Sequence, residues 1–268
     1  MSLLKLYVTP SLRKEVDSLN LDNIDIQDSP EQCDIQLDFI ETKHSDQPTL
    51  ALTPVKSGAV SIDFIHGKKA HRRQFGGGKG QPLVRAMGKL DERSLRVIDA
   101  TAGMGNDAFV LSNQGFEVLM IERNPLIAML LSDAIDRAQK TLTEGHIEAL
   151  ESEIAINNLS LINANAADYL LNHSPEVDTI YMDPMYPEKK KKAAVNKEMA
   201  LLQALVGPDM DSSALLDAAL KTARYRVVVK RPKGAPIIQH PLYQPSTEIS
   251  SPNTRYDIYV IKALKKRY

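Results

Sequence analysis

The stretch LRVIDATAGMGNDAFVLSNQG, residues 95–115, decides the fold of this chain. A short apolar run ends in Asp99 and leads into a turn that contains Gly103 and Gly105, and a helix-type stretch then runs to Gly115. Short apolar runs between turn residues are typical of strands buried in a parallel sheet. Glycine lets the backbone of the turn approach a ligand closely, because it has no Cβ. The stretch therefore predicts a strand, a ligand-binding turn and a helix in succession.

The alternation of strands and helices continues to the end of the chain. Strands are predicted at EVLMIE, LSLINA, TIYMD, RVVVK and RYDIYVIK, and helices at IEALESEIAINN, EMALLQALV and SALLDAALKTA. A long helix is also predicted after Asn124 and Pro125, which suit its N-cap and first position. Its predicted buried face consists of Leu126, Ile127, Leu130, Leu131, Ala134, Ile135 and Ala138.

A proline-rich connection without a convincing crossover helix joins the last two predicted strands, RVVVK and RYDIYVIK. This connection favours an antiparallel final strand, because parallel neighbours need a crossover. Strands that alternate with helices otherwise specify a parallel sheet covered on both faces. We therefore predict an α/β protein with a Rossmann-like, mostly parallel seven-stranded sheet and an antiparallel last strand.

Three segments are predicted along the chain. Residues 1–62 hold the β-type stretches LLKLYV and DIQLDFIE and most of AVSIDFI, separated by turn-forming residues, and are predicted to form a small β-rich N-terminal domain. Residues 63–90 form a basic, glycine-rich connecting segment whose composition suits a mobile loop over a site. Residues 91–268 form the larger domain.

Composition excludes several classes of protein. A chain of 268 residues with 43% hydrophobic content is long enough for a full α/β core and one small appended domain. Cys33 is the only cysteine, which excludes a disulfide framework or a cysteine-based metal site within one chain, and we predict no metal. No apolar run reaches 18 residues and the N-terminus carries early charges, so we predict a cytoplasmic protein without a membrane span.

Basic residues cluster despite a net charge of -1. Residues 66–89 carry seven lysines and arginines and no acidic residue, and a second basic run covers residues 189–192. Such runs are often solvated surface, and that interpretation stays open at this point. The other interpretation is a contact with phosphates, since phosphate binding is largely electrostatic.

Polar residues at the predicted strand ends indicate a cofactor site. Ligands of doubly wound sheets bind beyond the carboxyl ends of the strands. Glu122 ends the second strand, where a carboxylate can accept hydrogen bonds from both hydroxyls of a ribose. A nicotinamide dehydrogenase shares this pattern, but the turn lacks the third glycine of G-x-G-x-x-G. The turn, D-x-x-x-G-x-G, instead resembles the first motif of class I methyltransferases, which bind S-adenosylmethionine.

The same superfamily usually places an adenine contact after the third strand, where this chain has Asn165 and Ala166. The Asn165 side chain offers both a donor and an acceptor to the adenine ring. The alternative is that Asn165 is a turn residue at the strand end.

The DPMYP sequence of residues 183–187 follows the fourth predicted strand and resembles the [DNS]-P-P-[YFW] motif of amino methyltransferases, with Met in place of the second Pro. An amine on an aromatic ring is a poor nucleophile, so its protons must be held by acceptors before it attacks a methyl group. The Asp183 carboxylate and the Pro184 carbonyl can accept them, and Tyr186 can stack on an extruded base. The alternative is a proline-rich turn after a strand.

Together these segments resemble the bacterial small-subunit ribosomal RNA guanine-2-amino methyltransferase J family. The matching stretches include DFIHGKKAHRRQFGGGKGQPLVRAMG, VIDATAGMGNDAFVLSNQG, IERNPLIAMLL, YMDPMYPEKKKKAAVNKEM and RVVVKRP. The resemblance implies S-adenosylmethionine as cofactor, S-adenosylhomocysteine as product and small-subunit ribosomal RNA as partner. The predicted catalytic residues are Asp183, Pro184 and Tyr186. The predicted cofactor contacts are Ala102, Gly103, Gly105, Asn106, Asp107, Glu122, Arg123, Asn165, Ala166 and Asp183.

The resemblance also gives the basic runs a role, because an RNA enzyme must hold phosphates while the base enters. The residues predicted to contact RNA are Lys68, Lys69, Arg72, Arg73, Lys79, Lys189 and Lys190. Two alternatives remain: an amino methyltransferase of DNA adenine or protein glutamine, and an RNA-binding assembly factor without catalysis. The sequence leaves the oligomeric state open, with a monomer among the options.

Overall fold

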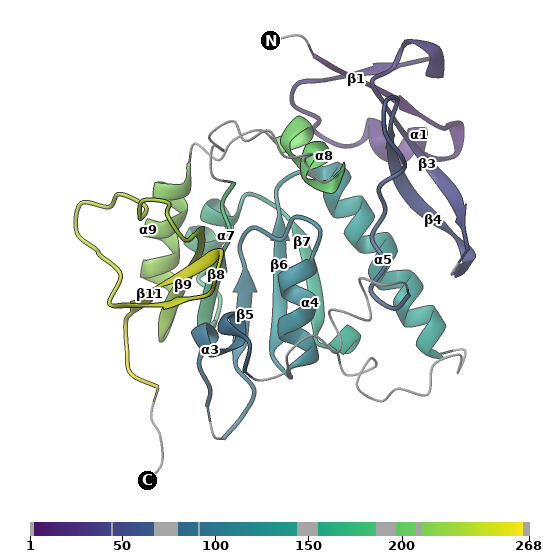
Figure 1. Ribbon diagram of the computed structural model, residues 1–268. Coiled ribbons are helices and arrows are strands. Elements are labelled where there is room, and N and C mark those ends of the chain that lie inside the picture. The colour runs from purple at the N-terminus through teal and green to yellow at the C-terminus, as the bar shows by residue number, and fades with distance from the viewer. Residues whose placement is uncertain are drawn as a thin grey trace.

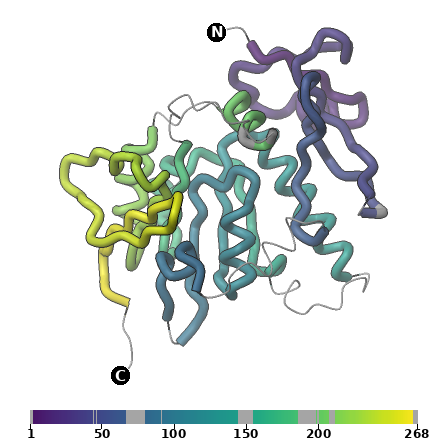
Figure 2. Tube along the Cα trace, viewed as in Figure 1, coloured from purple at the N-terminus to yellow at the C-terminus, as the bar shows by residue number. Residues whose placement is uncertain are grey.

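The computed structural model describes residues 3–43, 45–66, 80–90, 92–143, 155–185, 197–206 and 211–264. These residues form a small four-stranded sheet near the N-terminus and a seven-stranded sheet in the rest of the chain. The small sheet lies beside one end of the larger unit, next to its longest helix, and the C-terminal strands, drawn in yellow, lie at the opposite side of the molecule (Figures 1 and 2).

The larger sheet confirms the predicted fold. Its strand order is β10-β11-β9-β8-β5-β6-β7, and β11 is the one strand of this sheet that runs in the direction opposite to the others. The strands are β5 (Arg96–Asp99), β6 (Glu117–Glu122), β7 (Leu159–Asn163), β8 (Thr179–Met182), β9 (Arg226–Pro232), β10 (Thr247–Ser250) and β11 (Thr254–Val260). Strand β5 pairs with β6 on one side and β8 on the other, so the chain reverses its direction of winding there. Ligands of open α/β sheets bind at such a point.

Helices cover both faces of this sheet. Their bounds are α3 (Pro82–Met87), α4 (Asn106–Asn113), α5 (Pro125–Thr143), α7 (Ala166–His173), α8 (Lys197–Val206) and α9 (Ser212–Thr222). Buried residues of α3, α4 and α5 share one hydrophobic cluster, and those of α7 and α9 share a second. Val97 belongs to the first cluster and Ile98 to the second, as expected for a strand that is buried on both faces. All seven side chains of the predicted buried face of α5 are buried.

The N-terminal sheet has the order β2-β1-β3-β4. Its strands are β1 (Leu4–Val8), β2 (Ile24–Gln27), β3 (Ile35–Thr42) and β4 (Ser45–Pro54), with helix α1 (Pro10–Asp17) and a single 3-10 turn, η1 (Pro30–Gln32), between them. Strand β1 is parallel to β2 and β3, and β3 and β4 form an antiparallel hairpin. The two strands predicted at LLKLYV and DIQLDFIE are therefore present.

The prediction of a third strand in this region, at AVSIDFI, is wrong. Only Val60 makes a bridge, to Leu52, and the residues after it follow no ladder. The alternation that suggested a strand is real, because Val60, Ile62 and Phe64 are each at most 2% exposed. These side chains are buried in the hydrophobic cluster that also contains residues of α4 and α5. An extended segment that packs every second side chain against helices has the same period as a strand.

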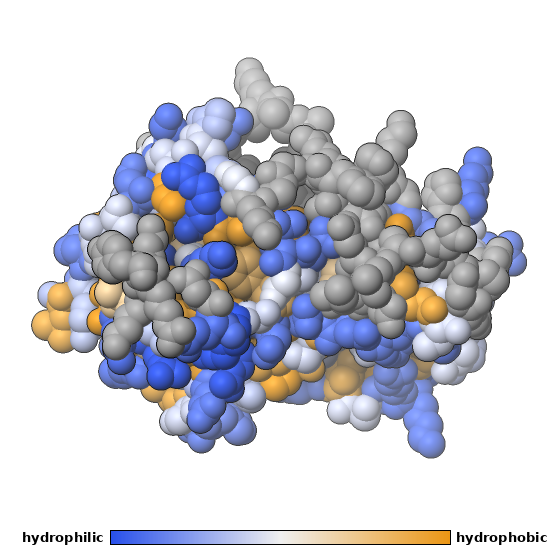
Figure 3. All heavy atoms as spheres, turned by 90° about the horizontal axis from the view of Figure 1, so that it is seen from below, coloured by the Kyte–Doolittle hydropathy of each residue, from blue (hydrophilic) through white to orange (hydrophobic). Residues whose placement is uncertain are grey.

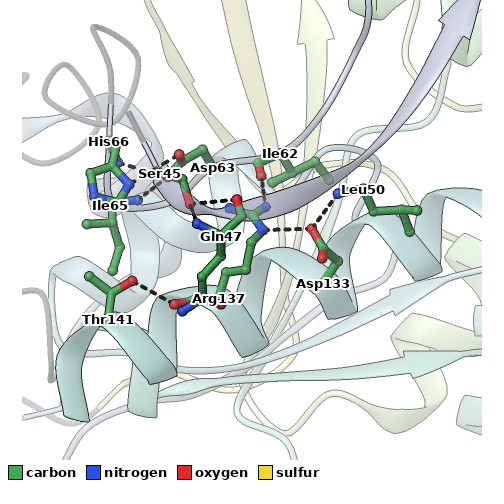
Figure 4. A network of polar contacts seen from close by, with 10 residues as sticks. All are labelled: Ser45, Gln47, Leu50, Ile62, Asp63, Ile65, His66, Asp133, Arg137 and Thr141. Carbon is green, nitrogen blue, oxygen red and sulfur yellow. Dashed lines mark hydrogen bonds and ion pairs between the residues drawn. The ribbon is translucent and has the colours of Figure 1, made fainter. Parts of the chain in front are cut away.

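A buried ion pair within α5 forms hydrogen bonds to the backbone of the N-terminal part of the chain (Figure 4). Arg137 donates from Nε to Asp133 Oδ2 at 2.8 Å and from Nη2 to the Ile62 carbonyl at 2.6 Å. The same Asp133 oxygen accepts the backbone N–H of Leu50, in β4, at 3.2 Å. One hydrophobic cluster also runs from Leu6 in β1 to α5, so apolar packing and polar contacts act together at this junction.

Within the described residues, no helix is both long enough and apolar enough to cross a membrane. Seen from below the view of Figure 1, the described surface is mostly hydrophilic and its apolar side chains form small separate groups (Figure 3). Isolated apolar side chains are normal on a protein surface.

Candidate active site

The turn between β5 and α4 has the backbone that its glycines predict. Gly103 has φ +53° and Gly105 has φ +67°, in the left-handed region that favours glycine. Gly103 lines a cavity beyond the strand ends. Gly105 is not among the lining residues, and a Cβ there would lie 2.9 Å from Leu131 Cδ2 and 3.0 Å from Phe64 Cζ. Gly105 therefore allows close packing behind the turn, while Gly103 faces the cavity.

Glu122 ends β6 with its carboxylate held by the backbone. Its Oε2 accepts the N–H of Gly103 at 2.8 Å, and its Oε1 accepts the N–H of Asn124 at 2.8 Å. Asn124 in turn caps α5, because its Oδ1 accepts the N–H of Leu126 at 3.0 Å and of Ile127 at 3.2 Å. Glu122 as a whole is only 5% exposed, and it lines the cavity. Each carboxylate oxygen can accept more than one hydrogen bond, so a fixed pair of acceptors faces the cavity.

The cavity has a volume of about 320 Å³ and lies at the carboxyl ends of β5, β6, β7 and β8. Nine of the ten predicted cofactor residues line it, all except Gly105. Asp183 and Pro184 of the predicted catalytic loop line the same cavity. The volume is at the lower end of that typical for small-molecule sites. The structure therefore brings the two halves of the predicted site together in one cavity.

Two polar residues on the β6 and β7 side of the cavity already form a hydrogen bond or an ion pair with other residues of the protein. The Oδ1 atom of Asn165 accepts the N–H of Asp168 at 3.2 Å and so caps helix α7. This is the turn role that competed with an adenine contact, although Asn165 also lines the cavity. Arg123 forms an ion pair with Asp211, with 3.2 Å between Nη1 and Oδ1, and both residues line the cavity.

Lys230 bridges two carboxylates at the opposite wall of the cavity. Its Nζ lies 2.7 Å from Asp107 Oδ2 and 2.9 Å from Asp183 Oδ2. The phenol of Tyr181 donates to the same Asp107 oxygen at 2.5 Å. Burial, followed by the neighbouring carboxylates, raises the pKa of Tyr181 well above its ordinary value, so the phenol remains a neutral donor.

Asp99 lies behind this cluster at the end of β5 and is 1% exposed. Burial raises its pKa to about 8, and the negative charges of Asp107 and Asp183 add to the effect. Its Oδ1 accepts the N–H of Thr101 at 3.1 Å. The Thr101 hydroxyl oxygen accepts the N–H of Asp183 at 2.6 Å, which fixes the start of the predicted catalytic loop relative to the cofactor turn.

Some predicted residues lie outside the part of the chain that the structure describes. These are Tyr186 and the basic residues Lys68, Lys69, Arg72, Arg73, Lys79, Lys189 and Lys190. Their roles stay predictions. The sequence reasoning gave no role to Thr101, Tyr181 or Lys230, which the structure places in the site. No sequence signal marked Lys230, because its place beside the strand that leads to Asp183 is known only from the order of the strands in the sheet.

This cavity fits S-adenosylmethionine by its chemistry. The cofactor carries a cationic sulfonium, and the cavity wall contains the carboxylates of Asp107 and Asp183. A fixed pair of carboxylate oxygens on Glu122 suits the two hydroxyls of an unphosphorylated ribose. No group of three or more metal-ligating side chains occurs in the described ranges. The fold and the cavity define a class I S-adenosylmethionine-dependent methyltransferase.

Comparisons with known proteins define the family more narrowly. A family model described as "Putative SAM-dependent methyltransferase" matches residues 16–261. Ribosomal RNA small subunit methyltransferase J of Hydrogenovibrio crunogenus is 58% identical over 216 residues, which cover 81% of this chain and 75% of that protein. The protein of the same name from Pseudomonas paraeruginosa is 43% identical, with 88% of each chain covered.

A solved structure also matches along almost the whole chain. The SAM-dependent methyltransferase of Neisseria gonorrhoeae is 28% identical, with a TM-score of 0.66, and the match covers 96% of this chain and 95% of that one. This chain belongs to the ribosomal RNA small subunit methyltransferase J family. The predicted family, the enzyme class and the cofactor are thereby confirmed.

Proposed function

We propose that this protein transfers a methyl group from S-adenosylmethionine to the exocyclic 2-amino group of a guanosine in small-subunit ribosomal RNA. The observation that carries the proposal is that Asp183 and Pro184 line the same cavity as Gly103 and Glu122. One cavity can therefore hold a methyl donor against a pair of acceptors for an amine. The names of the relatives support ribosomal RNA of the small subunit as the substrate.

The cofactor half of the site is preorganised. S-adenosylmethionine supplies a methyl group on a sulfonium, an electrophile that an amine can attack without a covalent enzyme intermediate. Glu122 orients the ribose through two oxygens that the N–H groups of Gly103 and Asn124 hold in place. Groups that are held in this way need little reorganisation when the ligand binds.

The amine half of the site acts by holding protons. The Asp183 carboxylate and the Pro184 carbonyl accept the two N–H groups of the amine, which directs the nitrogen lone pair toward the methyl carbon. The nitrogen loses one proton as the new carbon–nitrogen bond forms, and Asp183 accepts it. Tyr186 stacks on the extruded guanine in this proposal, a role that rests on the motif.

The proposed RNA contacts rest on the sequence. Lysines and arginines within residues 66–89 and 189–192 bind phosphates on either side of the target base. This part of the proposal also places the enzyme in the cytoplasm, where small-subunit ribosomal RNA is found. Charge reversal at Arg72 and Arg73 is expected to weaken RNA binding far more than cofactor binding, whereas equal losses indicate a structural role.

The test is methyl transfer to four substrates: small ribosomal subunits, free small-subunit ribosomal RNA, duplex DNA and protein. Nuclease digestion and mass spectrometry of the RNA identify the modified base. The expected product is a guanosine with one methyl group on its 2-amino nitrogen. Methylation of DNA adenine or of a protein glutamine instead rejects the proposed substrate, and no transfer to any of them favours an RNA-binding factor.

Asp183→Asn tests the assigned residue. The amide still resembles the carboxylate in size but cannot accept the proton, so kcat is expected to fall about 100-fold or more. Asp217→Asn is the matched control, because Asp217 pairs with Lys221 outside the cavity. Undiminished kcat in Asp183→Asn removes Asp183 from the chemistry.

A further inference from the structure

Lys230 occupies a position that connects the two halves of the site. Asp107 belongs to the first turn of α4, directly after the glycine turn that faces the cofactor. Asp183 is the first residue after β8 and belongs to the amine half. The Lys230 ammonium lies within 2.9 Å of a carboxylate oxygen from each of them. One cation thereby ties the cofactor turn to the loop that holds the amine.

The sheet register explains how Lys230 reaches Asp183. Strand β9 runs parallel to β8, and Val229 pairs with Met182, so the residues that follow each of them lie side by side. On its other side Lys230 pairs with Tyr256 of β11. The backbone of Asp183 is held separately, by the bond from its N–H to the Thr101 hydroxyl at 2.6 Å. Thr101 thus fixes the main chain of Asp183, and Lys230 contacts its carboxylate.

The cost of this arrangement argues that the lysine serves the chemistry. The residues before it are Val227, Val228 and Val229, all at most 1% exposed, and the Lys230 side chain itself is only 27% exposed. A buried ion pair is often no more stabilising than well-packed apolar residues. Apolar side chains at positions 107, 183 and 230 together could therefore maintain the fold at a comparable free energy, whereas an apolar side chain at position 230 alone leaves Asp107 and Asp183 without this cation.

The charge state of Lys230 limits what it can do. Burial lowers its pKa, but Asp107 and Asp183 together outweigh burial and raise the pKa above the ordinary value of lysine. The side chain therefore stays an ammonium, which has three donors and no acceptor. It cannot take the proton that the amine releases, but it can hold a carboxylate in one orientation.

We infer that Lys230 is a positioning residue for methyl transfer, which orients the Asp183 carboxylate toward the target amine and anchors it to Asp107 of the cofactor turn. The inference rests on the proposed function, because it presupposes that Asp183 holds the amine. Without Lys230, Asp183 turns away from its productive orientation. The loss appears in kcat, because the positioning interaction acts where the amine reacts.

The same geometry predicts that the loss of Lys230, which lowers kcat, does not lower the affinity for the cofactor. S-adenosylmethionine is a sulfonium cation, and Lys230 is a cation in the wall of the cavity. Removal of the ammonium leaves a more negative wall, so S-adenosylmethionine is expected to bind at least as tightly as it does to the unchanged protein. The neutral product S-adenosylhomocysteine gains less from this change. A purely structural role predicts weaker binding of both.

The experiment compares Lys230→Met, Lys230→Arg and the control Lys221→Met in the full chain. Lys221 is a solvent-exposed lysine that pairs with Asp217 on α9, outside the cavity. Lys230→Met is expected to lower kcat by about 10- to 100-fold, Lys230→Arg to restore part of the loss, and Lys221→Met to match the unchanged protein. Calorimetry with S-adenosylmethionine and S-adenosylhomocysteine measures cofactor binding, and thermal unfolding checks the fold.

Two results overturn the inference and leave the proposed function standing. One is a Lys230→Met protein whose kcat stays within about twofold of the unchanged protein while Asp183→Asn is inactive; this rejects the role of Lys230 and leaves the proposed function intact. The other is a parallel loss of kcat, cofactor affinity and thermal stability in both Lys230 variants, which identifies a structural lysine. Full activity of Asp183→Asn, by contrast, rejects the proposed role of Asp183, and the inference with it.

Discussion

Replacing Arg137 with methionine tests the junction between the N-terminal sheet and α5. The Arg137 and Asp133 side chains are 8% and 14% exposed, so their ion pair is largely excluded from water. Methionine keeps much of the apolar length of arginine but removes the donors to Asp133 and to the Ile62 carbonyl. Asp133 then remains as a buried carboxylate with the Leu50 N–H at 3.2 Å.

The expected loss is at the lower end of the range for breaking a buried ion pair, about 3 kcal/mol, because Asp133 keeps the N–H of Leu50. For a chain of this size each 1 kcal/mol corresponds to roughly 2–4 °C, so Tm is expected to fall by about 6–12 °C. Arg13→Met is the matched control. Arg13 forms a pair of the same spacing with Asp17, but those side chains are 35% and 52% exposed, so Arg13→Met is expected to leave the stability nearly unchanged.

The assay is urea unfolding followed by circular dichroism, together with hydrogen exchange of the backbone amides of β4. The exchange of these amides should accelerate in Arg137→Met, because the contact between Asp133 and Leu50 depends on the same carboxylate. A second variant, Asp133→Asn with Arg137→Met, removes the unpaired charge and should recover part of the lost stability. Equal stability of Arg137→Met and Arg13→Met would refute the assignment of a buried ion pair at this junction.

Two further predictions concern the cofactor turn. Gly105→Ala should lower the free energy of unfolding by about 2 kcal/mol, because a Cβ at φ +67° is strained and would also lie 2.9 Å from Leu131. Gly115→Ala, at φ +88° with nothing within 4 Å of its Cβ, carries the strain alone, so equal losses in urea unfolding would contradict the packing argument. Asp99→Asn should change how the free energy of unfolding depends on pH. Burial raises the pKa of Asp99 in the folded protein to about 8, whereas the pKa in the unfolded chain is about 4. The unchanged protein is therefore stabilised by the tightly held proton fully below about pH 4, and this stabilisation is lost as the pH rises from about 4 to about 8. Unfolding of both proteins without cofactor at pH 5 and pH 8 measures the difference, and identical pH slopes would show that Asp99 titrates normally.

The strand ends and the glycine turn were predictable from the sequence because local chemistry determines them. Gly103 and Gly105 have the positive φ angles that glycine favours, and Asn124 caps α5 as its position before Pro125 indicates. The apolar spacing of α5 gave its buried face, since one side of a 19-residue helix must face the core. These features depend on residues within one or two turns of one another.

Other features escaped because their causes are distant in sequence or leave no apolar pattern. Strand β10 is mostly exposed, so its four residues carry no burial signal inside a proline-rich connection. Helix α7 has only eight residues and follows the strand end at once, with Asn165 as its cap. Asp133 meets Leu50 across 83 positions, and Arg137 meets Ile62 across 75, so only the folded chain reveals that contact.

The residues of the candidate site also differ in whether the sequence alone could predict them. The place of Glu122 in the cavity was predictable because the end of the second strand lies at the ligand-binding edge of this fold. Lys230 was not, because its value depends on two carboxylates that arrive from α4 and from the end of β8. A lysine in a strand carries no sign of its partners until the strand order is known.

Phe64 gives the segment before the larger sheet a direct part in the cofactor turn. Its ring stacks on Phe109 of α4, with 5.1 Å between centroids, and lies against Gly105. A shortened protein that starts after residue 66 would have a ring-sized hole behind the glycine turn between β5 and α4. Anyone who transplants this catalytic unit into another protein must therefore carry the preceding segment along, or supply a replacement aromatic ring at that spot.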